Sequence, residues 1–476
     1  MSASGSDELH EIRQGLRMAH PPDPEELAQE KAYLNSLQGK SLGARIRGYG
    51  RFVGPGYLQS AMTLGGGTAA ASLFAGAAFG YRLLWVAPLA MLMGIWMLSA
   101  VSHQTLSTGQ RPYQAMAHFA GKPFALAWAL GALLSSIIWH FPQYSLASAV
   151  LVDMGDVFGL PGLSPFAMGL VVLVWAVALS MLYGSSPALV RWYERLLKYM
   201  VWGIVFAFGA VVAKTGIINW GELGRGFLPL PLPGDHNAGT ENAVAAVTVI
   251  LSGLSAAVGV NMLFLYPYTL LARGWGREHR GLARFDLLTG MFLPYALATC
   301  LMILATANTL HANGEFSGTG LRPVEAARIL GEVLGPTYGR VLFNFGILGM
   351  ALSSITLQML CAGFVCMELF GFEVGSRKYR LATLLPVPGF LGSILWADIA
   401  VWIAVPTNIV CGFLLPAAYF GFIKLQGNRD YLGEDFPRGG RGRLWLVGMV
   451  GITLFLTAFL AWYAVSKGPG YLEKLF

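Results

Sequence analysis

The chain has 476 residues, of which 55% are hydrophobic and only 12% charged, and its formal net charge is +7. So little charge excludes a soluble protein, and the apolar residues gather in runs of about 20, the length that crosses a bilayer as a helix. We expect an all-α polytopic membrane protein, because an outer-membrane barrel would show alternating segments of about ten residues instead.

The apolar runs predict about eleven transmembrane helices. In chain order they cover residues 54–79, 83–107, 123–151, 164–183, 196–213, 243–273, 285–308, 340–367, 381–396, 399–423 and 443–466. Residues 1–50 mix charges with proline and have no apolar core, so they are expected to form a cytosolic N-terminal tail.

Basic residues are concentrated in every second loop. Arg45, Arg47 and Arg51 precede the first helix, and Arg191 and Arg195 follow the fourth. Because lysine and arginine accumulate on the cytoplasmic side, this pattern predicts a protein of the cell (inner) membrane with its N-terminus in the cytoplasm and its C-terminus outside. These loops account for the positive charge, so we expect no nucleic-acid partner.

Enzymatic and metal-cofactor functions have no support in the sequence. The four cysteines fall within predicted helices without CxxC spacing, which argues against disulfides and a zinc site. Since no nucleophile and base, or set of metal ligands, stands at a recognisable spacing, the chain is not expected to be an enzyme or to carry a cofactor.

Two helices are expected to be discontinuous. The first contains the stretch TLGGGT at 63–68, and the sixth is too long for one crossing and holds Gly259, Asn261 and Pro267. Interrupted spans that open two halves of a chain are typical of inverted-repeat transporters, which bind substrate between the breaks. The predicted organisation is a first repeat at 51–213, an outer loop at 214–242, a second repeat at 243–424, a cytosolic loop at 425–442, and the eleventh helix with the C-terminus at 443–476.

The glycine run in the first helix has two explanations. Adjacent glycines release backbone N–H and C=O groups from the helical ladder, and such groups persist at membrane depth only where they face a cavity or ligand. Close packing of helices is the alternative, since small residues often serve it. Three consecutive glycines favour the cavity, with N–H groups open to a ligand.

Several segments resemble the natural resistance-associated macrophage protein (Nramp) family of divalent metal transporters. They include GPGYLQSAMTLGGGTAAASLFAGAAFGYRLLWV at 54–86, NMLFLYPYTLLARG at 261–274 and the polar turn near Asn408. The resemblance extends from Gly54 to about Lys424. It implies the five-plus-five inverted-repeat fold of the amino-acid/polyamine/organocation superfamily with an extra helix, working by alternating access.

The departures from the family fall on its metal ligands. Where the family has the Asp and Asn of D-P-G-N, this chain has Gly65 and Thr68, and Gly259 stands where the family has a methionine. Ala256 aligns with the residue whose backbone carbonyl joins the family's site. None of the family's side-chain ligands is present, so the resemblance implies a weak, neutral cage to which Asn408 also contributes, and Mn²⁺ or Fe²⁺ bound in the family's manner is not expected.

The proton relay of the family is also altered. Its helix-three acids align with His140 and Gln143, and its helix-six histidine aligns with Asn261, whereas Arg273 is retained. We expect His140, Gln143 and Arg273 to serve gating or coupling. A neutral hydrogen bond for His140 and a positive-inside anchor role for Arg273 are the alternatives.

Two kinds of cargo remain open for the expected transporter. A hydrated divalent cation such as Mg²⁺ is the interpretation that the family favours, and a small anionic or zwitterionic organic solute is the alternative that the glycine break favours. A non-transporting receptor is a remote third.

The expected partners are this solute or ion and the lipid bilayer, and the sequence leaves the oligomeric state, the coupling ion and the direction of transport open. The expected substrate-binding residues are Gly65, Gly66, Gly67, Thr68, Ala256, Gly259, Asn261 and Asn408.

Overall fold

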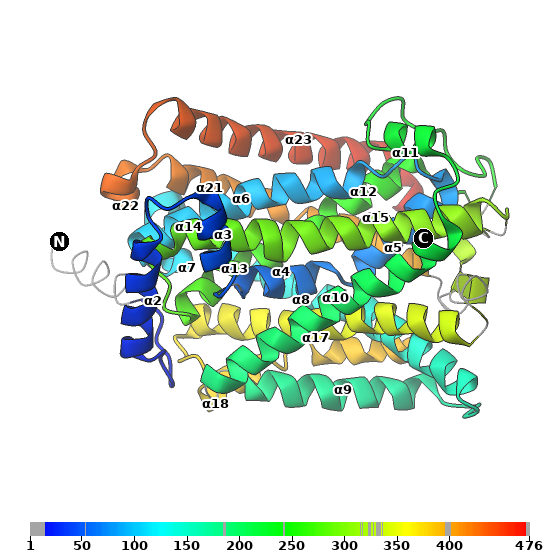
Figure 1. Ribbon diagram of the computed structural model, residues 1–476, viewed down its shortest axis with the longest axis horizontal. Helices are drawn as coiled ribbons and strands as arrows, with labels where there is room; N and C mark the ends of the chain where they lie inside the picture. The colour runs from blue at the N-terminus through cyan, green and yellow to red at the C-terminus, as the bar shows by residue number, and fades with distance from the viewer. Residues whose placement is uncertain are drawn as a thin grey trace.

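The computed structural model describes residues 15–472, except for positions 53, 184–186, 241–242, 315, 317, 322–324, 327, 330–334, 336 and 396–400. The regular elements in this part of the chain are helices, as expected (Figure 1). Within it, nine helical spans are long and apolar enough to cross a membrane, and a bent pair makes a tenth. The all-α polytopic fold class is confirmed.

The first and sixth helices are both broken, as the sequence predicts. The first consists of α4 (Pro55–Thr63) and α5 (Gly66–Phe79), which meet at an angle of 57°. The sixth consists of α12 (Ala246–Ala257) and α13 (Val260–Ala272), separated at Val258 and Gly259. In both cases a glycine stands just before the second half-helix, where the backbone is extended.

The other elements surround these two broken helices (Figure 1). The longer ones are α6 (Val86–Thr108), α8 (Lys122–Val157), α9 (Pro165–Leu182), α10 (Pro187–Thr215), α15 (Leu293–Thr306), α17 (Tyr338–Phe370) and α23 (Gly439–Leu472). The shorter ones are α2 (Pro24–Ser36), α3 (Leu42–Tyr49), α7 (Pro112–Met116), α11 (Trp220–Gly226), α14 (Arg280–Asp286), α18 (Arg377–Ala382), α19 (Gly392–Leu395), α20 (Ala404–Gly412), α21 (Leu415–Gln426) and α22 (Arg429–Leu432).

One predicted helix differs from the structure. The segment expected to form a helix over 381–396 is instead divided among the end of α18, a 3-10 turn at Val387–Leu391, and α19. Pro386 and Pro388 have no N–H to donate to a helical ladder, which explains the interruption. Residue 396 lies outside the described residues.

The break in the first helix lies at the centre of the bundle. Every residue of α4 and α5 is buried. The α4 half packs against α10 and α17, and the α5 half packs against α12 and α15. Helices α8 and α17 pack along each other beside them, so the two breaks are enclosed by protein.

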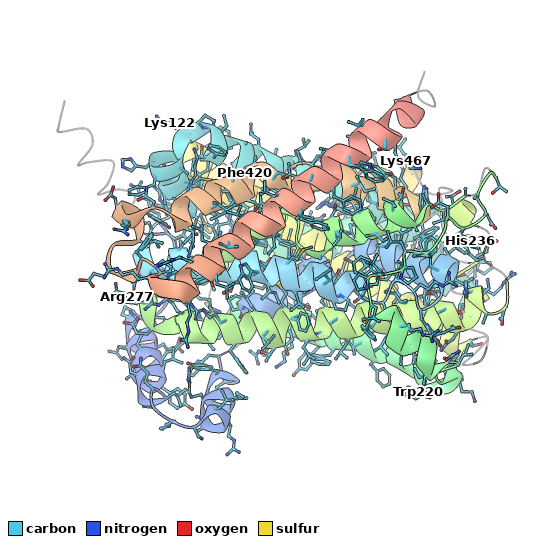
Figure 2. The ribbon with its side chains drawn as sticks, turned by 90° about the horizontal axis from the view of Figure 1, so that it is seen from above. Lys122, Trp220, His236, Arg277, Phe420 and Lys467 are labelled. Atoms are coloured by element: carbon cyan, nitrogen blue, oxygen red, sulfur yellow. The ribbon has the colours of Figure 1, made fainter. Side chains whose placement is uncertain are left out.

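The two ends of the bundle carry different elements. Figure 2 shows Lys122 and Arg277 at one end, and Trp220, His236 and Lys467 at the other. Helices α2, α3 and α22 lie at the first of these ends (Figure 1). The loops that contain Lys122 and Arg277, both predicted to be cytoplasmic, therefore lie at the same end of the bundle. The orientation in the membrane and the repeat boundaries stay predictions.

Candidate functional site

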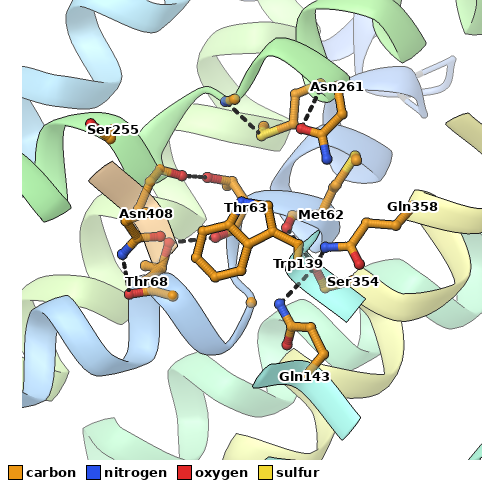
Figure 3. Close-up of a pocket in the computed structure, with 15 residues that line it drawn as sticks. Met62, Thr63, Thr68, Trp139, Gln143, Ser255, Asn261, Ser354, Gln358 and Asn408 are labelled. Atoms are coloured by element: carbon orange, nitrogen blue, oxygen red, sulfur yellow. Dashed lines mark hydrogen bonds between the residues drawn. The ribbon is translucent and has the colours of Figure 1, made fainter. Parts of the chain in front are cut away.

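A cavity of about 30 Å³ lies where the two broken helices meet, which is room for one or two water-sized bodies (Figure 3). Its walls come from α4, α5, α8, α12, α13, α17 and α20. The 15 lining residues are Met62, Thr63, Gly65, Gly67, Thr68, Trp139, Gln143, Ser255, Ala256, Gly259, Asn261, Met262, Ser354, Gln358 and Asn408.

Most of the residues expected to bind substrate line this cavity together. They are Gly65, Gly67, Thr68, Ala256, Gly259, Asn261 and Asn408, and Gln143 joins them from the gating set. Three expected residues do not line it. Gly66 faces α8. His140 lies on α8, one turn before the lining residue Gln143, and Arg273 follows the last residue of α13.

Side chains from α8 and α17 hold both sides of the first break. The N–H of Gly66 donates to Oε1 of Gln143 at 2.9 Å, so this amide is not free for a ligand as the sequence suggested. The Nε2 of Gln143 donates to Oγ of Ser354 at 3.2 Å. Ser354 in turn donates to the carbonyl of Met62 at 3.1 Å. The last turn of α4 and the first turn of α5 are therefore fixed to one network.

A second set of bonds joins the two broken helices. The hydroxyl of Thr63 donates to the carbonyl of Ala257 at 2.6 Å, at the end of α12. The hydroxyl of Thr68 donates to the carbonyl of Thr63 at 2.5 Å and so spans the break itself. These contacts satisfy backbone groups that the broken ladder releases, as a membrane interior requires.

Close approach of side chains explains why the run contains only glycine. A Cβ added to Gly65 would lie 2.6 Å from Nε2 of Gln143 and 2.8 Å from Oγ of Ser354. A Cβ added to Gly67 would fall against the Trp139 ring and Oδ1 of Asn408. The glycines therefore make room for polar side chains at a cavity rather than for helix packing alone.

The cavity is electrically neutral but contains a free acceptor. None of the lining side chains among the described residues is charged. Nδ2 of Asn408 donates to the carbonyl of Gly67 at 3.0 Å and to Oγ of Ser252 at 2.7 Å. Because a carbonyl can only accept, these bonds fix the amide orientation, and Oδ1 is left buried without a partner in the described part of the chain. The site thus offers an acceptor to a ligand that carries donors or positive charge.

His140 is buried behind the cavity and belongs to its supporting layer. Its Nδ1 donates to the carbonyl of Ser136 at 3.0 Å. Its ring also lies beside Gln358, which lines the cavity and donates to Ser354 at 3.2 Å. Within the described residues, Nε2 of His140 has no hydrogen-bond partner. The hydrogen-bonded chain from the break therefore ends at Gln358, and His140 lies beside it without joining it.

Charged groups hold the N-terminal end of α4, which the predicted orientation places on the inner side of the membrane. Asp286 on α14 accepts from the N–H of Gly54 at 3.1 Å and from that of Gly56 at 2.5 Å, at the positive end of the helix dipole. Arg273 forms an ion pair with Glu194 beside Gly54. Arg273 therefore lies beside the N-terminal end of α4 rather than at the cavity, and its role in gating stays a prediction.

Sequence reasoning missed several residues of this arrangement. Ser354 and Gln358 sit on α17, and Asp286 lies in the preceding membrane span, Arg277–His311. A buried amide or carboxylate within an apolar span is costly, so Gln358 and Asp286 were detectable signals. The thioethers of Met62 and Met262 also line the cavity, and nothing in their spacing distinguished them from packing residues.

Replacement of Gln143 with leucine should lower both stability and ligand affinity. Leucine keeps much of the volume but removes the acceptor of the Gly66 N–H, and an unsatisfied buried amide costs about 1–3 kcal/mol. We expect the melting temperature to fall by several degrees. The matched control is Thr453→Val, which removes a hydroxyl bonded only to its own helix at Met449 and should change the melting temperature much less. Equal losses in the two variants would show that Gln143 has no special role.

Comparison with known proteins identifies relatives and neighbours. Residues 56–465 match the model of the family described as natural resistance-associated macrophage protein-like. A divalent metal cation transporter MntH from Ralstonia nicotianae is 26% identical over 406 residues, which are 80% of this chain and 84% of the relative. MntH 1 from Pseudomonas aeruginosa is 25% identical over 433 residues, 88% and 93% of the two chains.

Solved structures resemble the fold at low sequence identity. A manganese transporter from Eremococcus coleocola superposes with a TM-score of 0.66 at 14% identity, covering 90% of this chain and 96% of its own. The nucleobase-cation-symport-1 family transporter Mhp1 gives a TM-score of 0.55 at 15% identity, covering 87% and 93%. Both likenesses support an inverted-repeat transporter fold.

Proposed function

The chain belongs to the natural resistance-associated macrophage protein family of membrane transporters, and from this premise we propose that its cargo is a divalent cation that keeps part of its water, such as Mg²⁺. The proposal also supposes the alternating-access mechanism that the broken helices favour. The observation that carries it is the free Oδ1 of Asn408 in a cavity without charged side chains.

A neutral site suits an ion that is not fully dehydrated. Mg²⁺ gives up water reluctantly and usually keeps several water ligands, which can be held by hydroxyl and amide oxygens. Thr68 and Asn408 supply such groups here, together with backbone carbonyls released at the breaks. With its inner end closed, the cavity has room for one or two water-sized bodies, so a hydrated ion requires the same site to widen as it opens.

The alternative cargo is a small anionic or zwitterionic organic solute. The first turn of α5 opens at the cavity through Gly65 and Gly67, and a helix N-terminus favours negative charge. Against this, Gln143 already occupies the N–H of Gly66. The free acceptor on Asn408 is also unfavourable for an anion, so the cation is the better-supported cargo.

Ligand-induced stabilisation distinguishes the two cargoes. Purified protein is heated with Mg²⁺, with small amino acids or with small organic acids, and a ligand that binds only the folded state raises the melting temperature. We expect a rise with Mg²⁺ and saturable Mg²⁺ uptake into reconstituted vesicles. Asn408→Leu should lose both responses, whereas the exposed control Asn313→Leu should keep them. A shift with organic acids and none with Mg²⁺ would favour the alternative.

Transport should proceed without stoichiometric proton movement. His140 is fully buried, and the lining of the nearby cavity offers no carboxylate to balance an imidazolium, so a charge there would cost several kcal/mol. We expect the pH inside reconstituted vesicles to stay constant during Mg²⁺ uptake. Acidification that depends on Mg²⁺, is lost in His140→Ala and persists in the exposed control His118→Ala would contradict this prediction and assign proton coupling to His140.

A further inference from the structure

A second, much larger cavity lies at the end of the bundle that carries α2. Its volume is about 770 Å³, within the range of ligand pockets. Its walls are formed by residues 18–22, helix α2, residues 50–52, Gly54, the first turn of α4, the early turns of α10 and the end of α13. It is separate from the cavity at the helix breaks.

The lining of this second cavity is rich in charge. Five of its side chains are cationic: Arg51, Arg191, Arg195, Lys198 and Arg273. Arg191 pairs with Glu26 at 3.3 Å, and Arg273 pairs with Glu194. Asp23 accepts from the N–H of Glu25, and Glu30 lies 3.5 Å from Nε2 of His279 with its Oε1 not hydrogen-bonded within the described residues, so the lining holds four carboxylates against five cations.

Three cations of the lining are left without a carboxylate partner in the described residues. Arg51 lies over the ring of Tyr33, at 5.4 Å from its centre, and Lys198 lies over the ring of Tyr57 at 5.1 Å. Arg195 donates only to the carbonyl of Arg191 on its own helix, at 3.3 Å. Stacking on a ring leaves ammonium and guanidinium donors available, so the cavity presents positive charge that an anion would satisfy.

The surroundings place this cavity at the level of lipid headgroups. Arg191, Arg195 and Lys198 are spaced i, i+4 and i+7 and therefore share one face of α10. Trp192, which follows Arg191, is 46% exposed, and Tyr199, which follows Lys198, is 72% exposed. Exposed tryptophan and tyrosine beside basic residues are typical of the bilayer interface, and basic pockets at that depth bind anionic headgroups.

We propose that this cavity binds the headgroup of an anionic phospholipid. The phosphate contacts Arg195 and Lys198 from one side and Arg51 from the other. Because Gly54 and Tyr57 also line this second cavity, the bound headgroup touches the first turn of α4. The last turn of α4 lines the cavity at the helix breaks through Met62 and Thr63. Anionic lipid thereby stabilises the docked position of α4.

The test measures thermal unfolding of the detergent-purified chain, so it does not depend on the identity of the cargo. Short-chain phosphatidylglycerol, short-chain phosphatidylcholine and inorganic phosphate are titrated separately. We expect phosphatidylglycerol alone to raise the melting temperature, by at least about 3 °C at saturation. The double variant Arg195→Gln/Lys198→Gln should lose this shift. The matched control Lys214→Gln/Arg225→Gln removes two exposed cations from the other end of α10 and from α11, and should keep it.

Each other outcome overturns the proposal. Equal shifts with both lipids would show no headgroup recognition, and a shift with inorganic phosphate alone would assign a free anion instead. Retention of the full shift in the double variant would place the lipid elsewhere. Since Lys198 packs on Tyr57 and its loss could impair folding, Arg195→Gln alone serves as a second variant, and it should lose at least half of the shift.

Discussion

Replacement of Gly67 with alanine should abolish ligand binding and transport while the protein remains folded. The added methyl group would fall against the Trp139 ring and Oδ1 of Asn408. Trp139 and Asn408 both line the cavity, so a displacement of either side chain that relieves this clash changes the shape of the cavity. We expect the altered cavity not to hold the ligand. We expect the ligand-induced thermal shift and vesicle uptake to disappear.

Two further alanine variants make this result specific. Gly131→Ala is the control, because a Cβ at that position on α8 meets Leu414 at an ordinary 3.5 Å and should leave binding unchanged. Gly66→Ala should have an intermediate effect, since its Cβ would meet Oε1 of Gln143 and Cδ2 of Leu146 at 3.1 Å, away from the cavity. For Gly67→Ala the unliganded melting temperature should fall by only a few degrees, about 1–2 kcal/mol. Full binding in Gly67→Ala, or its failure to fold, would return the glycine run to the packing explanation.

The sequence predicts the fold well because the bilayer imposes strong rules on it. Helix length, loop charge and interrupted spans are all readable along the chain, and the breaks at Gly65 and Gly259 lie where the glycines indicate. The segment at 381–396 was harder, because an apolar run looks like a helix while Pro386 and Pro388 divide it. Hydropathy alone does not register that loss of backbone donors.

The cavity lining was predictable where the broken helices supply it, and where the family resemblance indicates a position on another helix, as it does for Gln143 on α8 and Asn408 on α20. The glycines, Thr68 and Asn261 are found by locating the breaks, whereas Ser354 and Gln358 reach the cavity from α17. Their contribution depends on how α17 rotates against α8, which no local pattern encodes. Similarly, the sequence suggests free N–H groups at the glycine run, and only the packing of α8 shows that Gln143 occupies one of them.

Mn²⁺ should not be transported at the concentrations at which Mg²⁺ is. A transition metal bound at mid-membrane must give up water, and a carboxylate ligand normally offsets that cost. Here the lining oxygens belong to hydroxyl, amide and backbone groups, as far as the structure describes it. Met62 and Met262 do offer thioethers, but a thioether is neutral, and Sδ of Met262 already accepts from the N–H of Gly259 at 3.5 Å. For a transition metal, the cavity therefore lacks a negatively charged ligand, whereas soft sulfur ligands are present.

Asn408→Asp tests this reasoning by adding one charge at nearly constant shape. The new carboxylate keeps the free oxygen of Asn408 and places negative charge in the cavity, while its second oxygen can no longer donate to the Gly67 carbonyl as Nδ2 does. Because the added charge attracts the ion more than the lost hydrogen bond costs, we expect a net rise in Mn²⁺ affinity of at least tenfold, about 1.4 kcal/mol. Asn408→Leu, of similar size and without charge, should bind neither ion. Vesicles loaded with a metal-sensitive dye provide the measurement, with protein-free vesicles as the background. Saturable micromolar Mn²⁺ uptake by the unmodified chain would show that thioethers and neutral oxygens suffice, and the argument from missing charge would then be wrong.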